Sequence, residues 1–168
     1  MNAPVPTPGL TASQTIGPFP HEGWRWAFDP HDDARPVQIR GRVFDGAGDP
    51  VDDAVLEAWV PGATSGTVLP GLPGLFRTHA GEGGSFRLCL PRHGVAGEPA
   101  AYVTVFARGL TVHQFTAVFL GDELDPPLLA QVPEARRATV QARPADGGGF
   151  TWDLHLQGPD ETVFFDFR

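Results

Sequence analysis

Residues 101–122 read AYVTVFARGLTVHQFTAVFLGD, and this stretch decides the fold. Ala101–Ala107 and Thr111–Leu120 are rich in β-branched and aromatic residues, a composition that predicts two long strands. A tight turn at Arg108-Gly109 would join them, because Gly109 can adopt a positive φ without steric cost. Both faces of each strand are largely apolar. The stretch therefore predicts a central hairpin that is covered on both sides, rather than an edge exposed to solvent.

Arg108 is the one cation in this otherwise uncharged hairpin, and it lies at the tip. Two interpretations of it are open. Composition alone favours a solvated turn residue, because arginine is mostly exposed in folded proteins. The alternative is a guanidinium that a rigid hairpin holds out to meet an anion.

The composition of the chain favours a single β-rich domain. Its 168 residues are enough for one domain with a sizeable core. The 21 glycines and 18 prolines predict short strands with many turns instead of long helices. About eight strands at turn-punctuated spacing are typical of a two-sheet β-sandwich, an all-β fold. Besides the hairpin, the predicted strands are Val37–Phe44, Ala54–Val60, Ser85–Leu90, Thr139–Ala142, Phe150–Leu156 and Thr162–Phe167.

Residues 1–36 are predicted to form an extended N-terminal arm and docking segment, and residues 37–168 the β-sandwich domain. Proline, which cannot pair in the middle of a sheet, occupies three of the first ten positions. The large apolar side chains that follow are too many for a solvated tail, so they predict docking on this domain or on a partner. These side chains are Ile16, Phe19, Trp24, Trp26 and Phe28.

The net charge of −8 argues against a nucleic-acid or membrane-surface role, since both need a basic face. No apolar run reaches membrane-spanning length, and the N-terminus has neither the basic nor the apolar region of a secretory signal. We therefore expect a cytoplasmic protein. The single cysteine, Cys89, leaves no intrachain disulfide and is expected to be a packed, inert thiol.

The residues alone show no catalytic constellation. The six histidines include no H-x-H or H-x-x-x-H pair, so no metal site is predicted. Tyr102 is the only tyrosine, and there is no G-x-S-x-G motif and no glycine-rich phosphate loop. Asp52 and Asp53 could pair, but they lie at a turn entering a strand, where solvated acids are common.

Four stretches together resemble one family, the intradiol ring-cleaving dioxygenases. They run from near the start of the chain to its end, and the SQT-x-GP and ETVFFDF motifs are specific in combination. The stretches are Thr11–Phe19 (TASQTIGPF), Asp45–Trp59 (DGAGDPVDDAVLEAW), Phe106–His113 (FARGLTVH) and Leu156–Phe167 (LQGPDETVFFDF).

The resemblance implies a β-sandwich and a non-haem Fe(III) held by two tyrosines and two histidines in an H-x-H pair. This chain has one tyrosine and no H-x-H, so it cannot bind iron in the family's way. The resemblance is to the alpha subunit of a heteromeric member, whose iron is bound by the partner beta subunit.

The resemblance also implies a substrate and a site. The heteromeric enzyme would cleave 3,4-dihydroxybenzoate with O2 to 3-carboxy-cis,cis-muconate. Thr15, Gly17, Pro18 and Arg108 match family positions that line the substrate pocket at the alpha/beta boundary, with Arg108 as the catalytic residue of this chain. Family alpha subunits often carry an arginine where this chain has Ala117, so charge compensation differs here.

Two other functions stay open. A non-catalytic β-sandwich binding module for small aromatic ligands is favoured by the missing iron ligands, whereas the arm motif and Arg108 are features that a carrier does not need. A related ring-cleaving enzyme that acts on another catechol is the third possibility.

Overall fold

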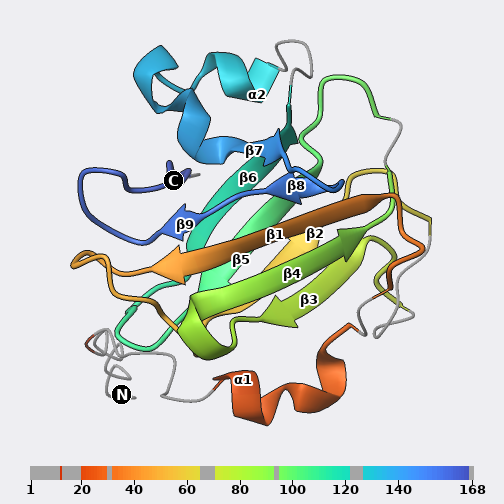
Figure 1. Ribbon diagram of the computed structural model, residues 1–168. Helices are drawn as coiled ribbons and strands as arrows, with labels where there is room; N and C mark the ends of the chain where they lie inside the picture. Colours follow the sequence, from red (N-terminus) through yellow and green to blue (C-terminus); the bar gives the residue numbers. More distant parts are fainter. Residues whose placement is uncertain are drawn as a thin grey trace, which may run out of the picture.

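The computed structural model describes residues 12, 20–29, 32–64, 71–92, 95–121 and 127–166. Over these ranges the chain forms two layers of β-strands that pack face to face, with short helices at the two ends (Figure 1). The strands are β1 (Val37–Phe44), β2 (Val55–Trp59), β3 (Leu75–His79), β4 (Ser85–Leu90), β5 (Ala101–Phe106), β6 (Gln114–Leu120), β7 (Gln141–Pro144), β8 (Phe150–Thr151) and β9 (Leu154–His155). The helical segments are α1 (Pro20–Gly23), η1 (Arg25–Ala27), η2 (Glu82–Gly84), α2 (Pro127–Ala130) and η3 (Glu134–Val140).

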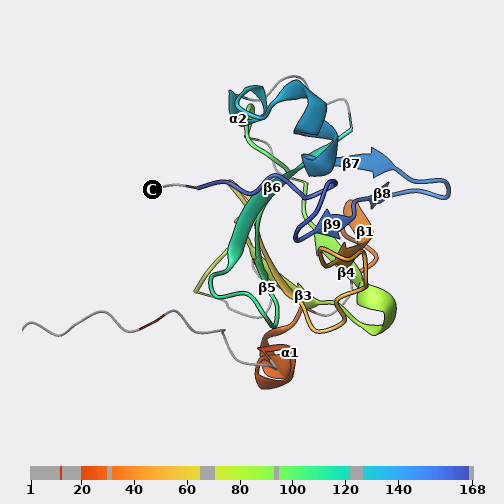
Figure 2. The ribbon, with the colours of Figure 1, turned by 90° about the vertical axis from the view of Figure 1, so that its left-hand side faces the viewer.

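One layer has the strand order β3-β2-β5-β6, and the other has the order β7-β8-β1-β4, with β9 also paired to β1. A short parallel pairing of β6 with β7 joins the two layers along one side. Figure 2 shows the layers edge-on. The expected all-β sandwich with little helix is therefore confirmed.

The main core fills the space between the layers. Strand alternation sends every second side chain of β1, β2, β4 and β5 inward, where these side chains are almost fully buried. Each fully buried aliphatic side chain of this kind stabilises the fold by about 2 kcal/mol. The inward residues of these strands include Ile39, Val43, Leu56, Ala58, Leu88, Leu90, Val103 and Val105.

The central hairpin has a wider connection than the sequence predicts. The ladder between β5 and β6 ends at the pair Val105 and Gln114, so the second strand begins three residues later than Thr111. The Leu110 N–H donates to the Ala107 carbonyl oxygen at 3.3 Å, and Gly109 has φ +85°. The residues of this local turn are not paired in the ladder. Arg108 therefore lies on a loop.

A second, smaller core covers the outer face of β6. Ala117 and Phe119 of that strand pack against Leu129, Val132 and Val140 of the segment that carries α2 and η3. Residues 117–120 are all buried, which confirms the prediction that β6 is covered on both faces. The outer face of β5 is less covered, because Tyr102 and its neighbours there are only half-buried.

The predicted strand Thr162–Phe167 is wrong over its described part. Residues 162–166 run as irregular chain beside β6, with Val163 and Phe165 packed against the second core and Phe164 against the main core. The Thr116 Oγ1 donates to the Val163 carbonyl oxygen at 2.7 Å, and the Phe165 N–H donates to the Phe115 carbonyl oxygen at 2.7 Å. One side-chain bond and one backbone bond hold the segment there in place of a strand ladder.

The predicted strand Phe150–Leu156 is split into β8 and β9, which both pair with β1 in parallel. Between them, the Trp152 N–H donates to the Arg40 carbonyl oxygen at 2.9 Å, and the Asp153 Oδ1 accepts from the Arg42 N–H at 2.9 Å. This approach is possible because Gly41 has no Cβ, since one built there would lie 1.7 Å from the Trp152 carbonyl oxygen.

Part of the predicted docking segment packs on this domain. The Trp24 ring contacts the Phe106 ring edge-on at 5.6 Å, and the Phe28 ring lies 4.8 Å from the His79 ring. Trp26, by contrast, is 71% exposed, and Ile16 and Phe19 lie outside the described residues. No helix in the described part of the chain is long and apolar enough to cross a membrane. The division of the chain at residue 36 stays a prediction.

Candidate functional site

Arg108 is exposed on the loop between β5 and β6, but its guanidinium is not free. Its Nε lies 3.1 Å from the Asp53 Oδ2, and its Nη2 lies 3.4 Å from the Asp52 Oδ1. Both acids come from the turn that leads into β2, far from Arg108 in the sequence. The fold therefore brings the sequence-predicted cation against two carboxylates.

The two carboxylates differ in burial. The Asp52 side chain is 59% exposed, as a solvated turn residue should be, whereas that of Asp53 is only 4% exposed. Neither oxygen of the Asp53 carboxylate has a hydrogen-bond partner among the described residues. A buried carboxylate without a countercharge is strongly unfavourable, so Arg108 compensates Asp53. The expectation of solvated acids is right for Asp52 and wrong for Asp53.

The loop that carries Arg108 borders a cavity of about 250 Å³. Three segments meet there: the turn after β1, the hairpin tip and the chain after β9. The lining residues are Asp45, Gly46, Pro50, Val51, Arg108, Gly109, Leu110, Leu156 and Gln157. Thr15, Gly17 and Pro18 lie outside the described residues, so their place in a pocket with Arg108 stays a prediction.

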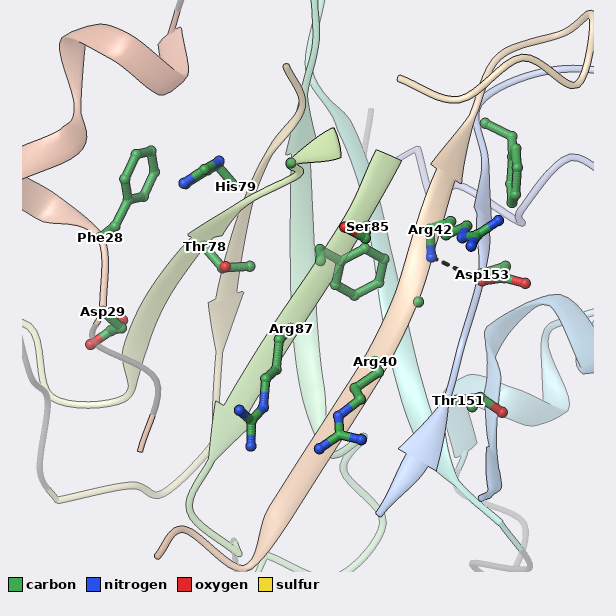
Figure 3. A pocket seen from close by; sticks show the side chains of 14 residues that line it. Phe28, Asp29, Arg40, Arg42, Thr78, His79, Ser85, Arg87, Thr151 and Asp153 are labelled. Atoms are coloured by element: carbon green, nitrogen blue, oxygen red, sulfur yellow. Dashed lines mark hydrogen bonds between the residues drawn. The ribbon is translucent and has the colours of Figure 1, made fainter. Parts of the chain in front are cut away.

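A larger groove of about 830 Å³ lies on the outer face of β1 and β4, away from Arg108 (Figure 3). Phe28 and Asp29 border it on one side and Thr151 and Asp153 on the other. Arg40, Arg42 and Arg87 supply its positive charge. Sequence reasoning did not find this groove, because the residues that line it are brought together only by the strand pairing.

Three arginines of this face form one row across four strands. In the strand register Arg143 pairs with Thr151, Thr151 with Arg40, and Arg40 with Arg87. Directly paired residues present their side chains on the same face, and like charges there repel each other. Figure 3 shows the Arg40 and Arg87 side chains projecting in the same direction from neighbouring strands.

The two directly paired arginines of the row differ in their partners. The Arg87 guanidinium is held by the Asp33 carboxylate and by the Gln38 Oε1 at 2.9 Å. The Arg40 side chain has no hydrogen bond or ion pair with any described residue. The row is thus a place where an anion would be favourable, on a chain of net charge −8.

Tyr102 lies on the outer face of β5 and is tied to a carboxylate. Its hydroxyl donates to the Glu98 Oε2 at 2.6 Å, and its ring stacks on the Phe115 ring at 5.9 Å. Burial of the phenol, together with the Glu98 carboxylate, raises the pKa of Tyr102 to about 12. The phenol is therefore neutral at physiological pH.

The described residues do not fit the iron that the resemblance implies. In the described ranges, no group of three or more histidine, cysteine, aspartate or glutamate side chains could hold a metal ion. His113 instead lies beside the Phe106 ring, with the two ring centres 5.7 Å apart.

Two curated proteins are similar to this chain over almost its whole length. The protocatechuate 3,4-dioxygenase alpha chain of Burkholderia cepacia is 34% identical over an alignment that covers 93% of this chain and 96% of that protein. The protein of the same name from Pseudomonas putida is 30% identical over an alignment that covers 94% of this chain and 96% of that protein. No family model matches the chain.

Solved structures of ring-cleaving dioxygenases share the fold. The dioxygenase domain of a carbohydrate-binding fusion protein from Streptomyces sp. SirexAA-E superposes with a TM-score of 0.54 at 21% identity, covering 88% of this chain and 98% of that one. Catechol 1,2-dioxygenase from Pseudomonas arvilla C-1 superposes with a TM-score of 0.50 at 16% identity, covering 82% and 58%. At these identities the likeness concerns the fold alone.

Proposed function

Since this chain belongs to the protocatechuate 3,4-dioxygenase alpha-chain family, we propose that it is the non-iron-binding subunit of a heteromeric intradiol dioxygenase. The assembled enzyme would cleave 3,4-dihydroxybenzoate between its two hydroxyls with O2, giving 3-carboxy-cis,cis-muconate. The Fe(III) would be bound by a beta subunit, and the reaction would take place in the cytoplasm.

The small number of possible iron ligands carries the assignment of the iron to a partner. Tyr102 is the only tyrosine of the chain, the sequence has no H-x-H pair, and the Tyr102 hydroxyl donates to Glu98. The work left to this chain is to supply part of the substrate pocket and an assembly surface. Thr15, Gly17 and Pro18 would line the pocket from the arm, and Arg108 would reach it from the hairpin tip.

Arg108 is chemically suited to the carboxylate of the substrate. A guanidinium presents five N–H donors in a planar fork and can bind a carboxylate through two parallel hydrogen bonds. The ion pairs with Asp52 and Asp53 use Nε and Nη2, which lie along one edge of the fork. The end of the fork that carries Nη1 remains available for the substrate carboxylate.

The first experiment is to produce the chain alone and together with an iron-bearing dioxygenase subunit, and to measure iron and visible absorption in both. We expect an iron-free, colourless chain alone, and a coloured complex with tyrosinate-to-iron charge transfer that cleaves 3,4-dihydroxybenzoate. Stoichiometric iron in the chain alone would refute the assignment of iron to the partner. Neither iron nor a complex would favour the binding module for small aromatic ligands.

The second experiment tests Arg108 in that complex. We expect Arg108→Ala to raise KM for 3,4-dihydroxybenzoate by about tenfold or more, since it removes a charge-assisted pair of hydrogen bonds. KM for catechol, which has no carboxylate, should change far less. Arg108→Lys is the matched control, which keeps the charge and loses the fork. Equal losses for the two substrates would leave Arg108 a structural residue only.

A further inference from the structure

We propose that Asp53 is the positioning residue for Arg108: its buried carboxylate holds the guanidinium in the orientation that receives the substrate carboxylate. The inference rests on the proposed function, because it needs Arg108 to meet the substrate. It adds a residue that lies inside the domain, behind the hairpin tip, and that does not itself touch the substrate.

The Asp53 carboxylate depends on Arg108, because no other described residue forms an ion pair with it. It is 4% exposed, and neither of its oxygens accepts a hydrogen bond from any described residue. Its charge is balanced by the Arg108 Nε at 3.1 Å. An ion pair with one buried member is poorly screened by water, so its orientation is maintained more strictly than that of a surface pair.

Backbone hydrogen bonds on both sides of Asp53 hold the main chain that carries its carboxylate. The Val51 N–H donates to the Val43 carbonyl oxygen at 2.8 Å, and the Ala54 carbonyl oxygen accepts from the Ala80 N–H at 2.7 Å. Val51 and Ala54 are both buried in the main core. Arg108, in contrast, lies on an exposed loop with a long side chain, and would sample many rotamers without this partner.

The contacts of the Arg108 guanidinium indicate that Asp53 positions Arg108. The Asp53 Oδ2 lies 3.1 Å from the Arg108 Nε, so the ion pair attracts that edge of the guanidinium toward the buried carboxylate. The Arg108 Nη1 has no ion pair with a described residue and is left for a second carboxylate. The Arg108 side chain is 59% exposed. This exposure is not needed to compensate the Asp53 charge, but it is needed to contact a ligand.

Asp52 provides a control of the same residue type on the same guanidinium. Its side chain is 59% exposed, and its Oδ1 lies 3.4 Å from Nη2, a long contact in high dielectric. Exposed ion pairs of this kind contribute little. If burial is what gives Asp53 its role, the two neighbouring acids should behave very differently.

The experiment compares Asp53→Asn with Asp52→Asn in the iron-loaded complex with the beta subunit. We expect Asp53→Asn to raise KM for 3,4-dihydroxybenzoate by about tenfold and to leave KM for catechol nearly unchanged. Asp52→Asn should change KM for 3,4-dihydroxybenzoate by about twofold at most. A structural defect would lower kcat for both substrates together, so this split between substrates is the diagnostic readout.

The double variant Asp53→Asn/Arg108→Ala completes the test and removes both charges, so no unpaired buried carboxylate can prevent folding. If Asp53 acts through Arg108, Asp53→Asn should add nothing to the KM effect of Arg108→Ala. A full additional loss in that background, or an unchanged or lower KM in Asp53→Asn alone, would overturn the inference. Failure of the proposed role of Arg108 gives a different result, because Arg108→Ala would then leave KM for 3,4-dihydroxybenzoate unchanged.

Discussion

At the scale of single residues, Tyr102 has the most strongly perturbed proton in the described part of the chain. Its phenol is partly withdrawn from water and donates to a carboxylate, and both effects favour the neutral form. Because the chain has one tyrosine, any tyrosinate signal in the isolated chain comes from this side chain.

We expect the tyrosinate ultraviolet absorbance of the chain to appear with a pKa of about 12, compared with 10.0 for an unperturbed tyrosine. The unfolded chain loses this proton first, so the free energy of unfolding should fall as the pH rises from 10.0 to about 12. Glu98→Gln, which keeps the shape of the partner and removes its charge, should bring the transition closer to 10.0. A titration near 10.0 in the unmodified chain would contradict the hydrogen bond to Glu98.

Arg108 and Asp53 show how far single residues can be predicted from the sequence. Arg108 stands out because it is the only cation in an uncharged hairpin. Asp53 does not stand out, since two acids at a turn look solvated until the fold shows which of them is buried. Burial is a property of the packing around a residue, and the local sequence does not contain it.

At the scale of elements, Gly41 shows how closely β1 is packed on its neighbours. A Cβ at this position would lie 1.7 Å from the Trp152 carbonyl oxygen and 2.9 Å from the Phe86 ring. The strand pairing on this side of β1 therefore requires glycine at position 41. This requirement concerns space, because the backbone of Gly41 is not in the positive-φ region.

We expect Gly41→Ala to lower the free energy of unfolding by about 3 kcal/mol or more, since β8 and β9 must move away from β1. Urea unfolding followed by tryptophan fluorescence measures this, because Trp152 lies at the contact. Gly23→Ala is the matched control, with no atom within 4 Å of the added Cβ, and should change the free energy of unfolding by less than about 0.5 kcal/mol. Similar results for the two variants would mean that the contact at Trp152 is looser than described.

The strands that were predicted correctly are those with clear alternation. Val37–Phe44 and Ser85–Leu90 have the predicted bounds, because each alternates along a buried face. Leu75–His79 was missed, since it follows a long loop rich in glycine and proline and carries an arginine and a histidine. Thr162–Phe167 looked like a strand because it is apolar, but its apolar residues cover β6 without forming a ladder.

At the scale of the whole molecule, the sandwich followed from strand count and spacing, whereas the arginine row did not. Arg143, Arg40 and Arg87 come from three separate strands, and only the register places them in one row. The sequence predicts which residues face outward on each strand, but it does not predict which strands are neighbours. For the same reason the groove of Figure 3 could not be foreseen.

The position of β1 in the sheet also determines when the protein can fold during synthesis. Arg42 in β1 and Asp153 beside β9 are hydrogen-bonded across 111 residues of chain. Most of the chain must therefore be synthesised before β1 can pair with β8 and β9. Until then, the backbone N–H and C=O groups on that edge of β1 lack their strand partners. Sheets that wait for such distant pairing fold slowly and are exposed to aggregation meanwhile.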